Sequence, residues 1–188
     1  MQAVEVLMKE HRLIERVLDA MEAWIKTVGH GNWADDKEEL AGFVTFIREF
    51  TDAYHHRKEE DILFVAMVDH GFPRKQGPVA VLLHEHDLGR SLASTLHGLA
   101  RQLSPWSEED RRTLTSTTRE YVSLLRRHIQ KEDKVLYPMA DARLPDPIKE
   151  EIFRRFERFE EERTRNGERG RLHGLADTLI DAADARTS

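Results

Sequence analysis

The stretch DAYHHRKEEDILF, residues 52–64, places two adjacent histidines shortly before two adjacent glutamates. On an α-helix, residues four apart share a face, so His55 lies beside Glu59 and His56 beside Glu60. Apolar side chains continue along the same helix on both sides of this cluster. A protein interior excludes such polar groups unless something pairs with them. The stretch therefore predicts a helical bundle with a polar site inside it.

Helical periodicity dominates the rest of the chain, without the alternation typical of β-strands. Apolar side chains recur in steps of three and four over four long segments, which predicts helices over residues 2–28, 34–68, 78–103 and 108–139. GHGNW (29–33) and SPWSEED (104–110) separate neighbouring segments, and Ser107 is expected to cap the last one. Short connections between long helices predict an all-α fold, an antiparallel up-down four-helix bundle.

Two further helical segments follow the sequence RLPDP (143–147). The first, PIKEEIFRRFERFEEERT (147–164), has one apolar edge on a highly charged helix, and the second is LHGLADTLIDAADA (172–185). We expect a bundle domain over residues 1–145 and a helical extension over 146–188. The additional C-terminal helices should pack outside the bundle or form a homodimer contact.

Composition narrows the class of protein. A chain of 188 residues suits one domain with a proper core, and no run of apolar residues is long enough to span a membrane. The net charge of −6 comes with both signs interspersed, which argues against nucleic-acid binding. With 0 cysteines and no signal-peptide pattern, a soluble cytoplasmic protein is expected, without disulfides or thiolate ligands.

Each of the four predicted bundle helices interrupts its apolar stripe with a histidine, and two of these histidines have a glutamate four residues later. Four imidazoles and two carboxylates should therefore point inward. This mixture suits iron, zinc or manganese, and facing carboxylates can bridge two cations. A polar network without metal is the alternative, but six groups from four helices are difficult to satisfy mutually. The expected metal ligands are His11, His55, Glu59, His86, His128 and Glu132.

Periodicity also decides between neighbouring histidines. The stripe that contains His55 and Glu59 is apolar on both sides, so His56 and Glu60 are expected to flank the site. His84 falls on a side stripe, which favours His86. The remaining histidines fall in loops, at a helix end or on outer faces, and are expected to be exposed to solvent: His30, His70, His97 and His173.

Over residues 5–145 the chain resembles the hemerythrin-like (HHE cation-binding) domains. The matching stretches are KEHRLIERVL, HHRKEEDILF, LLHEHDLGR and LLRRHIQKEDKVLYPMA. The resemblance implies a non-haem di-iron centre with an oxo- or hydroxo-type bridge, although zinc or manganese would also suit the donors. It further implies that the four histidines are terminal ligands and that the two glutamates bridge the ions.

The sequence departs from the oxygen-carrying members of the family in two ways. Asp133 stands five residues after His128, as the bridging aspartate does in those carriers, but Glu132 shares the face of His128 more closely and is preferred. Arg90 replaces a second histidine on the third helix. Each iron would then be about five-coordinate and open, unless one more side chain binds. The candidates for that extra ligand are Tyr54, His56 and Glu85.

Gly89, one turn after His86, would either leave room for a small molecule or allow a close helix contact. The leading functional hypothesis is a hemerythrin-like protein that binds or senses O2, NO or hydrogen peroxide at open iron positions. A stress-response enzyme or an iron-centre repair protein is the second hypothesis, although repair members usually carry an extra domain with a cysteine. The third is an interaction module whose charged helix, residues 147–165, docks a partner.

Overall fold

The fold was obtained as a computed structural model, which describes residues 1–29 and 32–187; His30 lies outside this range. Within the described residues all regular structure is helical, which confirms the predicted fold class.

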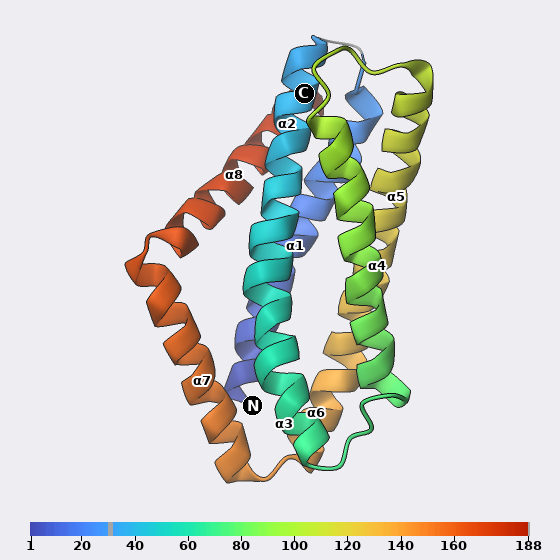
Figure 1. The fold of residues 1–188 in the computed structure, drawn as a ribbon. Helices are drawn as coiled ribbons and strands as arrows, with labels where there is room; N and C mark the ends of the chain where they lie inside the picture. Colours follow the sequence, from blue (N-terminus) through green and yellow to red (C-terminus); the bar gives the residue numbers. More distant parts are fainter. Residues whose placement is uncertain (30–31, 188) are drawn as a thin grey trace.

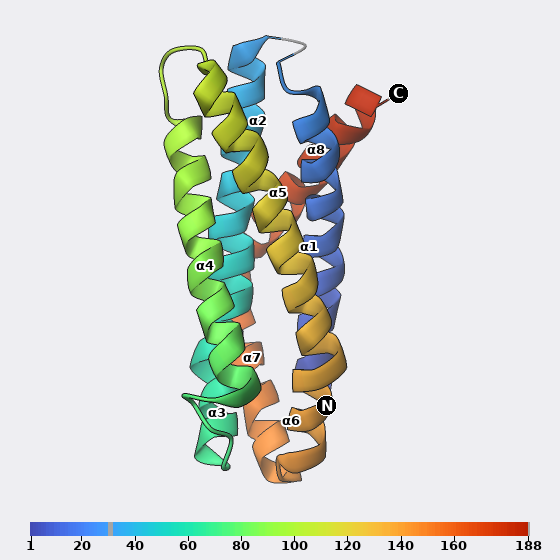
Figure 2. The ribbon, with the colours of Figure 1, turned by 90° about the vertical axis from the view of Figure 1, so that its right-hand side faces the viewer.

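Four long helical rods lie side by side (Figures 1 and 2). The first rod is α1 (Gln2–Thr27) and the third is α4 (Gly77–Ala100). The second comprises α2 (Trp33–Phe46), η1 (Ile47–His56), η2 (Glu59–Leu63) and α3 (Phe64–Asp69). The fourth comprises α5 (Glu108–Lys131), η3 (Glu132–Leu136) and α6 (Tyr137–Arg143).

The connection between α4 and α5 shows why these helices end where they do. Ser107 caps α5, as predicted: its hydroxyl accepts the Asp110 amide at 3.1 Å, and the Asp110 carboxylate accepts the Ser107 amide at 2.9 Å. Helix α4 ends at Ala100, earlier than predicted. The indole of Trp106 donates to the Leu99 carbonyl at 3.0 Å, so it satisfies a carbonyl that a longer helix would have used.

The apolar core is divided into two parts by a polar layer. One part surrounds Trp24 and Phe43, and the other surrounds Leu7 and Leu136. His11, which is fully buried, lies between them on α1, one turn from Leu7. The polar layer is thus enclosed by apolar side chains from both ends of the bundle.

The C-terminal helices, α7 (Asp146–Arg165) and α8 (Glu168–Thr187), run along one side of the bundle (Figure 1). Helix α7 buries Ile152 and Phe156, while α8 packs against α1 and α2. Arg186 near the end of α8 pairs with Asp36 at 3.0 Å and Glu39 at 2.9 Å, both on α2. Of the two expected arrangements, packing outside the bundle is therefore observed, and the homodimer contact stays a prediction.

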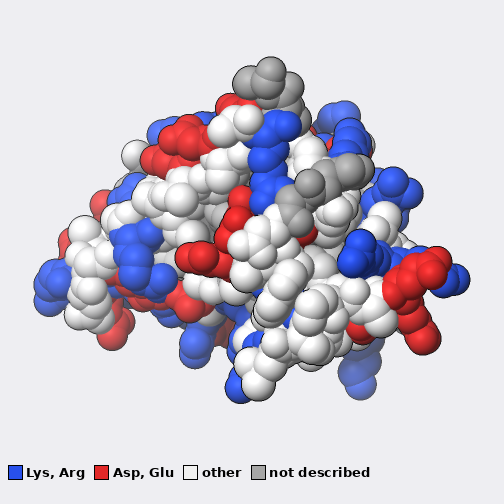
Figure 3. Space-filling model, turned by 90° about the horizontal axis from the view of Figure 1, so that it is seen from above, with Lys and Arg blue, Asp and Glu red and all other residues white. Residues whose placement is uncertain are grey.

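The outer surface carries charges of both signs. Viewed from the end where α1 joins α2, lysines and arginines alternate with aspartates and glutamates (Figure 3). Across the part of the chain that the structure describes, no helix combines the length and the apolar character needed to cross a membrane.

Replacing Phe156 by alanine tests the docking of α7. Because this ring is 1% exposed, the substitution should lower the free energy of unfolding by about 3–5 kcal/mol. The exposed neighbour Glu157 provides the control, and Glu157→Ala should change stability by less than about 0.5 kcal/mol. Urea denaturation of both variants gives the comparison. Equal stability of the two variants would contradict the packing of α7 on the bundle.

Candidate metal centre

The inward residues of the second rod lie on π-helical segments, and on the fourth rod Glu132 begins such a segment, whereas His128 lies in α5. Backbone amides there donate to carbonyls five residues earlier: Arg57 to Asp52, Phe64 to Glu59 and Tyr137 to Glu132. A π-turn accommodates one extra residue and changes which side chains face inward, and such turns are frequent at functional sites. Two of the three turns begin at the glutamates of the predicted site.

His56 is the main correction to the sequence analysis. It was expected to flank the site, but its side chain is 5% exposed and its ring stacks on His86 with centroids 3.8 Å apart. His55 is also buried, at 1% exposure. A regular α-helix would turn adjacent residues to different faces, whereas the π-helical segment that ends at His56 brings both rings inside.

The structure brings all six predicted residues together and arranges them as two clusters. In each cluster the potential ligand atoms lie within 4.8 Å of one another, and all the residues are buried. The Nε2 atoms of His11 and His55 are 3.0 Å apart, and those of His86 and His128 are 3.1 Å apart. The first cluster comprises His11, His55, Glu59 and Glu132; the second comprises His56, Glu59, His86 and His128.

The two inward carboxylates link the clusters. Glu132 places one oxygen 3.2 Å from Nε2 of His11 and the other 3.1 Å from Nε2 of His128. Oε2 of Glu59 lies 3.7 Å from Nε2 of His55 and 3.5 Å from Nε2 of His86. Asp133, the alternative bridge, lies behind His11 instead and contacts Nδ1 of its ring at 2.7 Å. The geometry therefore favours Glu132 as the bridging residue.

Four histidines are held from behind by their own carboxylates. A carboxylate oxygen only accepts hydrogen bonds, so the Nδ1 atom of each ring carries a proton and the Nε2 atom faces the interior. Outer carboxylates of this kind orient metal-binding histidines and fix their tautomer. The pairs are His11 with Asp133 (2.7 Å), His55 with Glu10 (2.8 Å), His86 with Glu60 (2.6 Å) and His128 with Glu85 (3.0 Å).

Each outer carboxylate is paired in turn with a cationic side chain. Arg12 pairs with Asp133, Lys58 with Glu10, Arg90 with Glu60 and Lys131 with Glu85. Lys58 is fully buried and also contacts Glu160 of α7 at 2.8 Å, so the C-terminal extension reaches the surroundings of the site.

Burial and mutual repulsion shift the pKa values of the inward groups. Burial, together with the charge of Glu132, raises the pKa of Glu59 well above its usual range. Burial by itself would raise the pKa of Glu132. The neighbouring His128 and His11 outweigh burial and hold the pKa of Glu132 well below its usual range. For His128, burial is outweighed by Glu132 and Glu85, which raise the pKa to about 9. Burial and the neighbouring histidines lower the pKa of His56 to about 3.

Several buried polar atoms of the site lack hydrogen-bond partners among the described residues. They are Oε2 of Glu59, both carboxylate oxygens of Glu132 and both ring nitrogens of His56. The Glu132 oxygens lie within ion-pair distance of two histidines but without hydrogen-bond geometry. Leaving buried polar groups unsatisfied is costly, and two cations among these donors would satisfy them. The donor set therefore fits a pair of metal ions.

Tyr137 is a site residue that the sequence analysis missed. Its hydroxyl donates to Oε1 of Glu59 at 2.6 Å and lies 3.4 Å from Nε2 of His11, over which its ring stacks. Tyr137 stands five residues after Glu132, a spacing that matches the inward face only when a π-turn intervenes. The sequence contained one indication of this role, because Tyr137 lies in the fourth-helix motif LLRRHIQKEDKVLYPMA.

The other candidates for an extra ligand stay outside the site. Tyr54 packs under the Lys58 ammonium, 4.4 Å from its ring centroid, and Glu85 reaches only the outer nitrogen of His128. His84, on the side stripe, is exposed. His70 and His173 are exposed as well, whereas His97 is half-buried, contrary to expectation, and lines a cavity between η1, α4 and α5.

Residues 2–140 match the hemerythrin HHE cation binding domain, so the chain belongs to this family. Its relatives include the uncharacterized proteins Rv1995 of Mycobacterium tuberculosis and Mb2018 of Mycobacterium bovis. Each is 28% identical over 184 residues, which cover 95% of this chain and 68% of the relative. No solved structure gives a significant match.

Replacing His56 by alanine should weaken metal binding in the second cluster, because one of its three imidazoles is removed. We expect a loss of at least about 10-fold in affinity, since even outer partners of metal ligands contribute about 10–100-fold. His55→Ala and Glu59→Ala should be at least as severe. Elemental analysis and chelator competition measure the effect.

His84→Ala is the matched control, because this histidine is exposed on α4 only two residues from His86. The control should retain the metal content of the unmodified protein. Equal retention in the His56 and His84 variants would restore the original expectation that His56 merely flanks the site.

Metal affinity should rise with pH. The folded, metal-free protein keeps a proton on His128 until about pH 9, and a metal ion must displace it. Loss of this proton should contribute up to about tenfold in affinity per pH unit above neutrality, and its contribution should level off near pH 9; the proton on Glu59 makes the rise steeper. Calorimetric titration with Mn²⁺ at several pH values tests this.

The Glu85→Gln substitution removes a charge that raises the pKa of His128, so it should move the plateau to lower pH. An unchanged plateau would contradict the conclusion that the proton on His128 controls metal affinity.

Proposed function

We propose that this protein holds two iron ions and binds a small diatomic or peroxide ligand (O2, NO or hydrogen peroxide) at one of them. The observation that carries the proposal is that the two clusters contain different numbers of imidazoles. The first cluster offers two imidazoles and the second offers three, while the two carboxylates lie between them. A six-coordinate metal in the first cluster would therefore have one position more to fill than its neighbour.

Iron is proposed because the donors are imidazoles and carboxylates without thiolates, a set that iron shares with manganese and zinc. A bound iron pair would supply reversible electron transfer to an oxygen or nitrogen ligand, which zinc cannot.

His56 completes the second cluster and revises the expectation that both ions are open. Arg90 stands where oxygen carriers have a histidine, and its contact with Glu60 helps to hold His86.

Tyr137 gives the first cluster a hydrogen-bond donor. Burial raises its pKa well above its usual range, so the phenol stays protonated at neutral pH. Its single proton is donated to Glu59 in this structure, and rotation of the hydroxyl would present that proton to an anionic ligand beside His11. Leu7 and Leu136 belong to the buried apolar cluster at that end of the bundle and keep water from the interior.

The two other hypotheses differ in their support. An enzyme that reduces NO or peroxide remains the alternative, and the proton on Tyr137 is the observation that favours it. Docking of a partner by the charged helix is less well supported, because Ile152 and Phe156 on its apolar edge already pack on the bundle.

The proposal predicts an optical response. Protein loaded with ferrous iron under nitrogen should gain near-ultraviolet absorption bands on exposure to air, and azide should change them. Tyr137→Phe should keep its iron but bind azide about 10–100-fold more weakly, the effect of losing one hydrogen bond to a charged group. Spectra and azide titration provide the measurement.

Tyr54→Phe is the control, because this tyrosine is equally buried but lies away from the clusters. Isolation of the protein with zinc alone, or spectra insensitive to azide, would refute the proposed function. Turnover of NO or peroxide by the loaded protein would favour the enzyme over the binder.

A further inference from the structure

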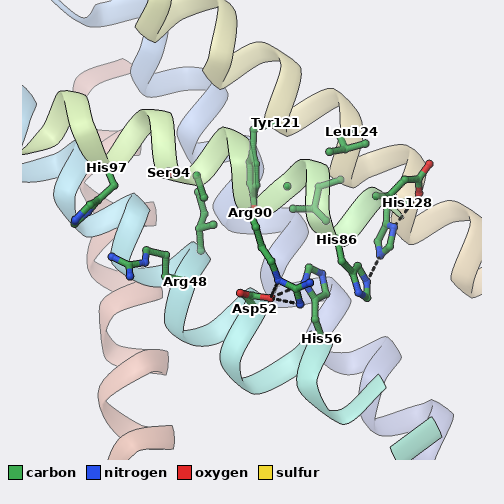
Figure 4. A pocket seen from close by; sticks show the side chains of 15 residues that line it. Arg48, Asp52, His56, His86, Arg90, Ser94, His97, Tyr121, Leu124 and His128 are labelled. Atoms are coloured by element: carbon green, nitrogen blue, oxygen red, sulfur yellow. Dashed lines mark hydrogen bonds and ion pairs between the residues drawn. The ribbon is translucent and has the colours of Figure 1, made fainter. Parts of the chain in front are cut away.

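A cavity of about 270 Å³ leads from the surface to the second cluster. It lies between η1, α4 and α5, and Figure 4 shows its two ends. His97 and Arg48 stand at one end, while His86 and His128 stand at the other, with His56 near them. A second hollow at the surface is also lined by Arg48 and His97, which places the mouth of the cavity at these residues.

The cavity is larger than a diatomic ligand requires. Holding one water molecule takes on the order of 15 Å³ of such space, so about 270 Å³ exceeds that need many times. It approaches the range of about 300–1,000 Å³ that is typical of sites for small organic molecules. The volume therefore fits an organic ligand of modest size and excludes a two-chain lipid.

Apolar side chains provide much of its lining, while Ser94, Arg90 and Asp52 lie between the two ends (Figure 4). The apolar lining residues are Ile47, Ala93, Tyr121, Leu124 and Leu125. Gly89 also lines the cavity, and a Cβ atom added there would meet only Tyr121, at an ordinary distance of 3.8 Å. Close helix packing therefore does not require this glycine, and its effect is to leave the cavity wider.

Charge at the mouth selects the chemistry of the ligand. Arg48 makes no ion pair with any residue that the structure describes, and its side chain is exposed. Arg90, the other arginine of the cavity, is fully engaged with Asp52 at 2.8 Å, Asp87 at 3.0 Å and Glu60. The mouth thus offers one uncommitted guanidinium, the group that best matches a carboxylate.

We propose that this cavity binds a small amphipathic carboxylate, whose acid group pairs with Arg48 and His97 and whose apolar body extends past Leu125 toward the second cluster. Arg48 would repel an amine, and the acidic lining residues Asp52 and Glu85 are already paired, with Arg90 and with His128 and Lys131. The bound acid would fill the passage from solvent to His86 and His128. The inference goes beyond the proposed function and does not depend on which metal the centre holds.

Calorimetry with a homologous series tests the proposal. Butyrate, hexanoate and octanoate are titrated into metal-free and metal-loaded protein, with 1-hexanol and hexylamine as probes of the same length. Affinity should increase about fourfold for each added methylene, the equivalent of about 0.8 kcal/mol per buried group, until the cavity is full. Hexanoate should bind at least about tenfold more tightly than 1-hexanol.

Two substitutions locate the site. Arg48→Ala should weaken hexanoate binding by about tenfold, the effect of one charge-assisted hydrogen bond. Gly89→Leu should abolish binding by filling the cavity, while helical content and metal content are retained, because leucine is the better helix former. Gly89→Ala, which adds a single methyl group, serves as the milder second variant.

Arg119→Ala is the control, since Arg119 is exposed on α5, away from the cavity, and forms no ion pair within the described ranges.

The expected result is saturable hexanoate binding, in metal-free and loaded protein alike, that Arg119→Ala leaves unchanged. Three outcomes would overturn the proposal: no saturable binding of any acid, equal affinity for hexanoate and 1-hexanol, or undiminished binding in folded Gly89→Leu protein. None of them would affect the proposed function, because metal content and the azide response are measured separately.

Discussion

The burial of two carboxylates among five imidazoles is the constraint on which the rest of this structure depends. Glu59 and Glu132 are fully buried, and their charges would repel each other in a medium that solvates them poorly. Protons on His128 and Glu59 relieve part of this cost in the metal-free protein, and two cations would relieve it more completely. The polar layer is therefore suited to metal ions, whose charge would offset the repulsion between these carboxylates.

Outer charges keep that layer in place. Each of four histidines is fixed by a carboxylate, and each carboxylate by a lysine or an arginine. One of these chains of contacts, from His55 through Glu10 and Lys58 to Glu160, reaches α7. The C-terminal extension is thus part of the support of the site and not only a cover for the bundle. Breaking such a buried pair on one side leaves a charge without its partner.

The two ends of the site differ in what surrounds them. Around the first cluster, Tyr137 stacks on His11 and donates to Glu59. Around the second, a cavity leads outward to Arg48. Fewer imidazoles and a phenolic donor favour small-ligand binding in the first cluster, whereas space and an uncommitted guanidinium favour an organic acid beside the second. Both clusters share the second and fourth rods, while α1 contributes only to the first cluster and α4 only to the second.

The amino-acid sequence alone determined the bundle and most of its polar layer. α-Helical periodicity is a local property, so it can be read from spacing along the chain. It revealed four apolar stripes, each interrupted by a histidine, and two glutamates that follow a histidine by four residues. Tertiary structure decided the rest. The π-turns that bring His56 and Tyr137 inside depend on packing between rods, and so does the contact of Asp133 with His11 instead of a bridging position. Neither the burial of Lys58 nor the cavity beside Gly89 can be read from spacing along one helix, because each is formed by segments far apart in the chain.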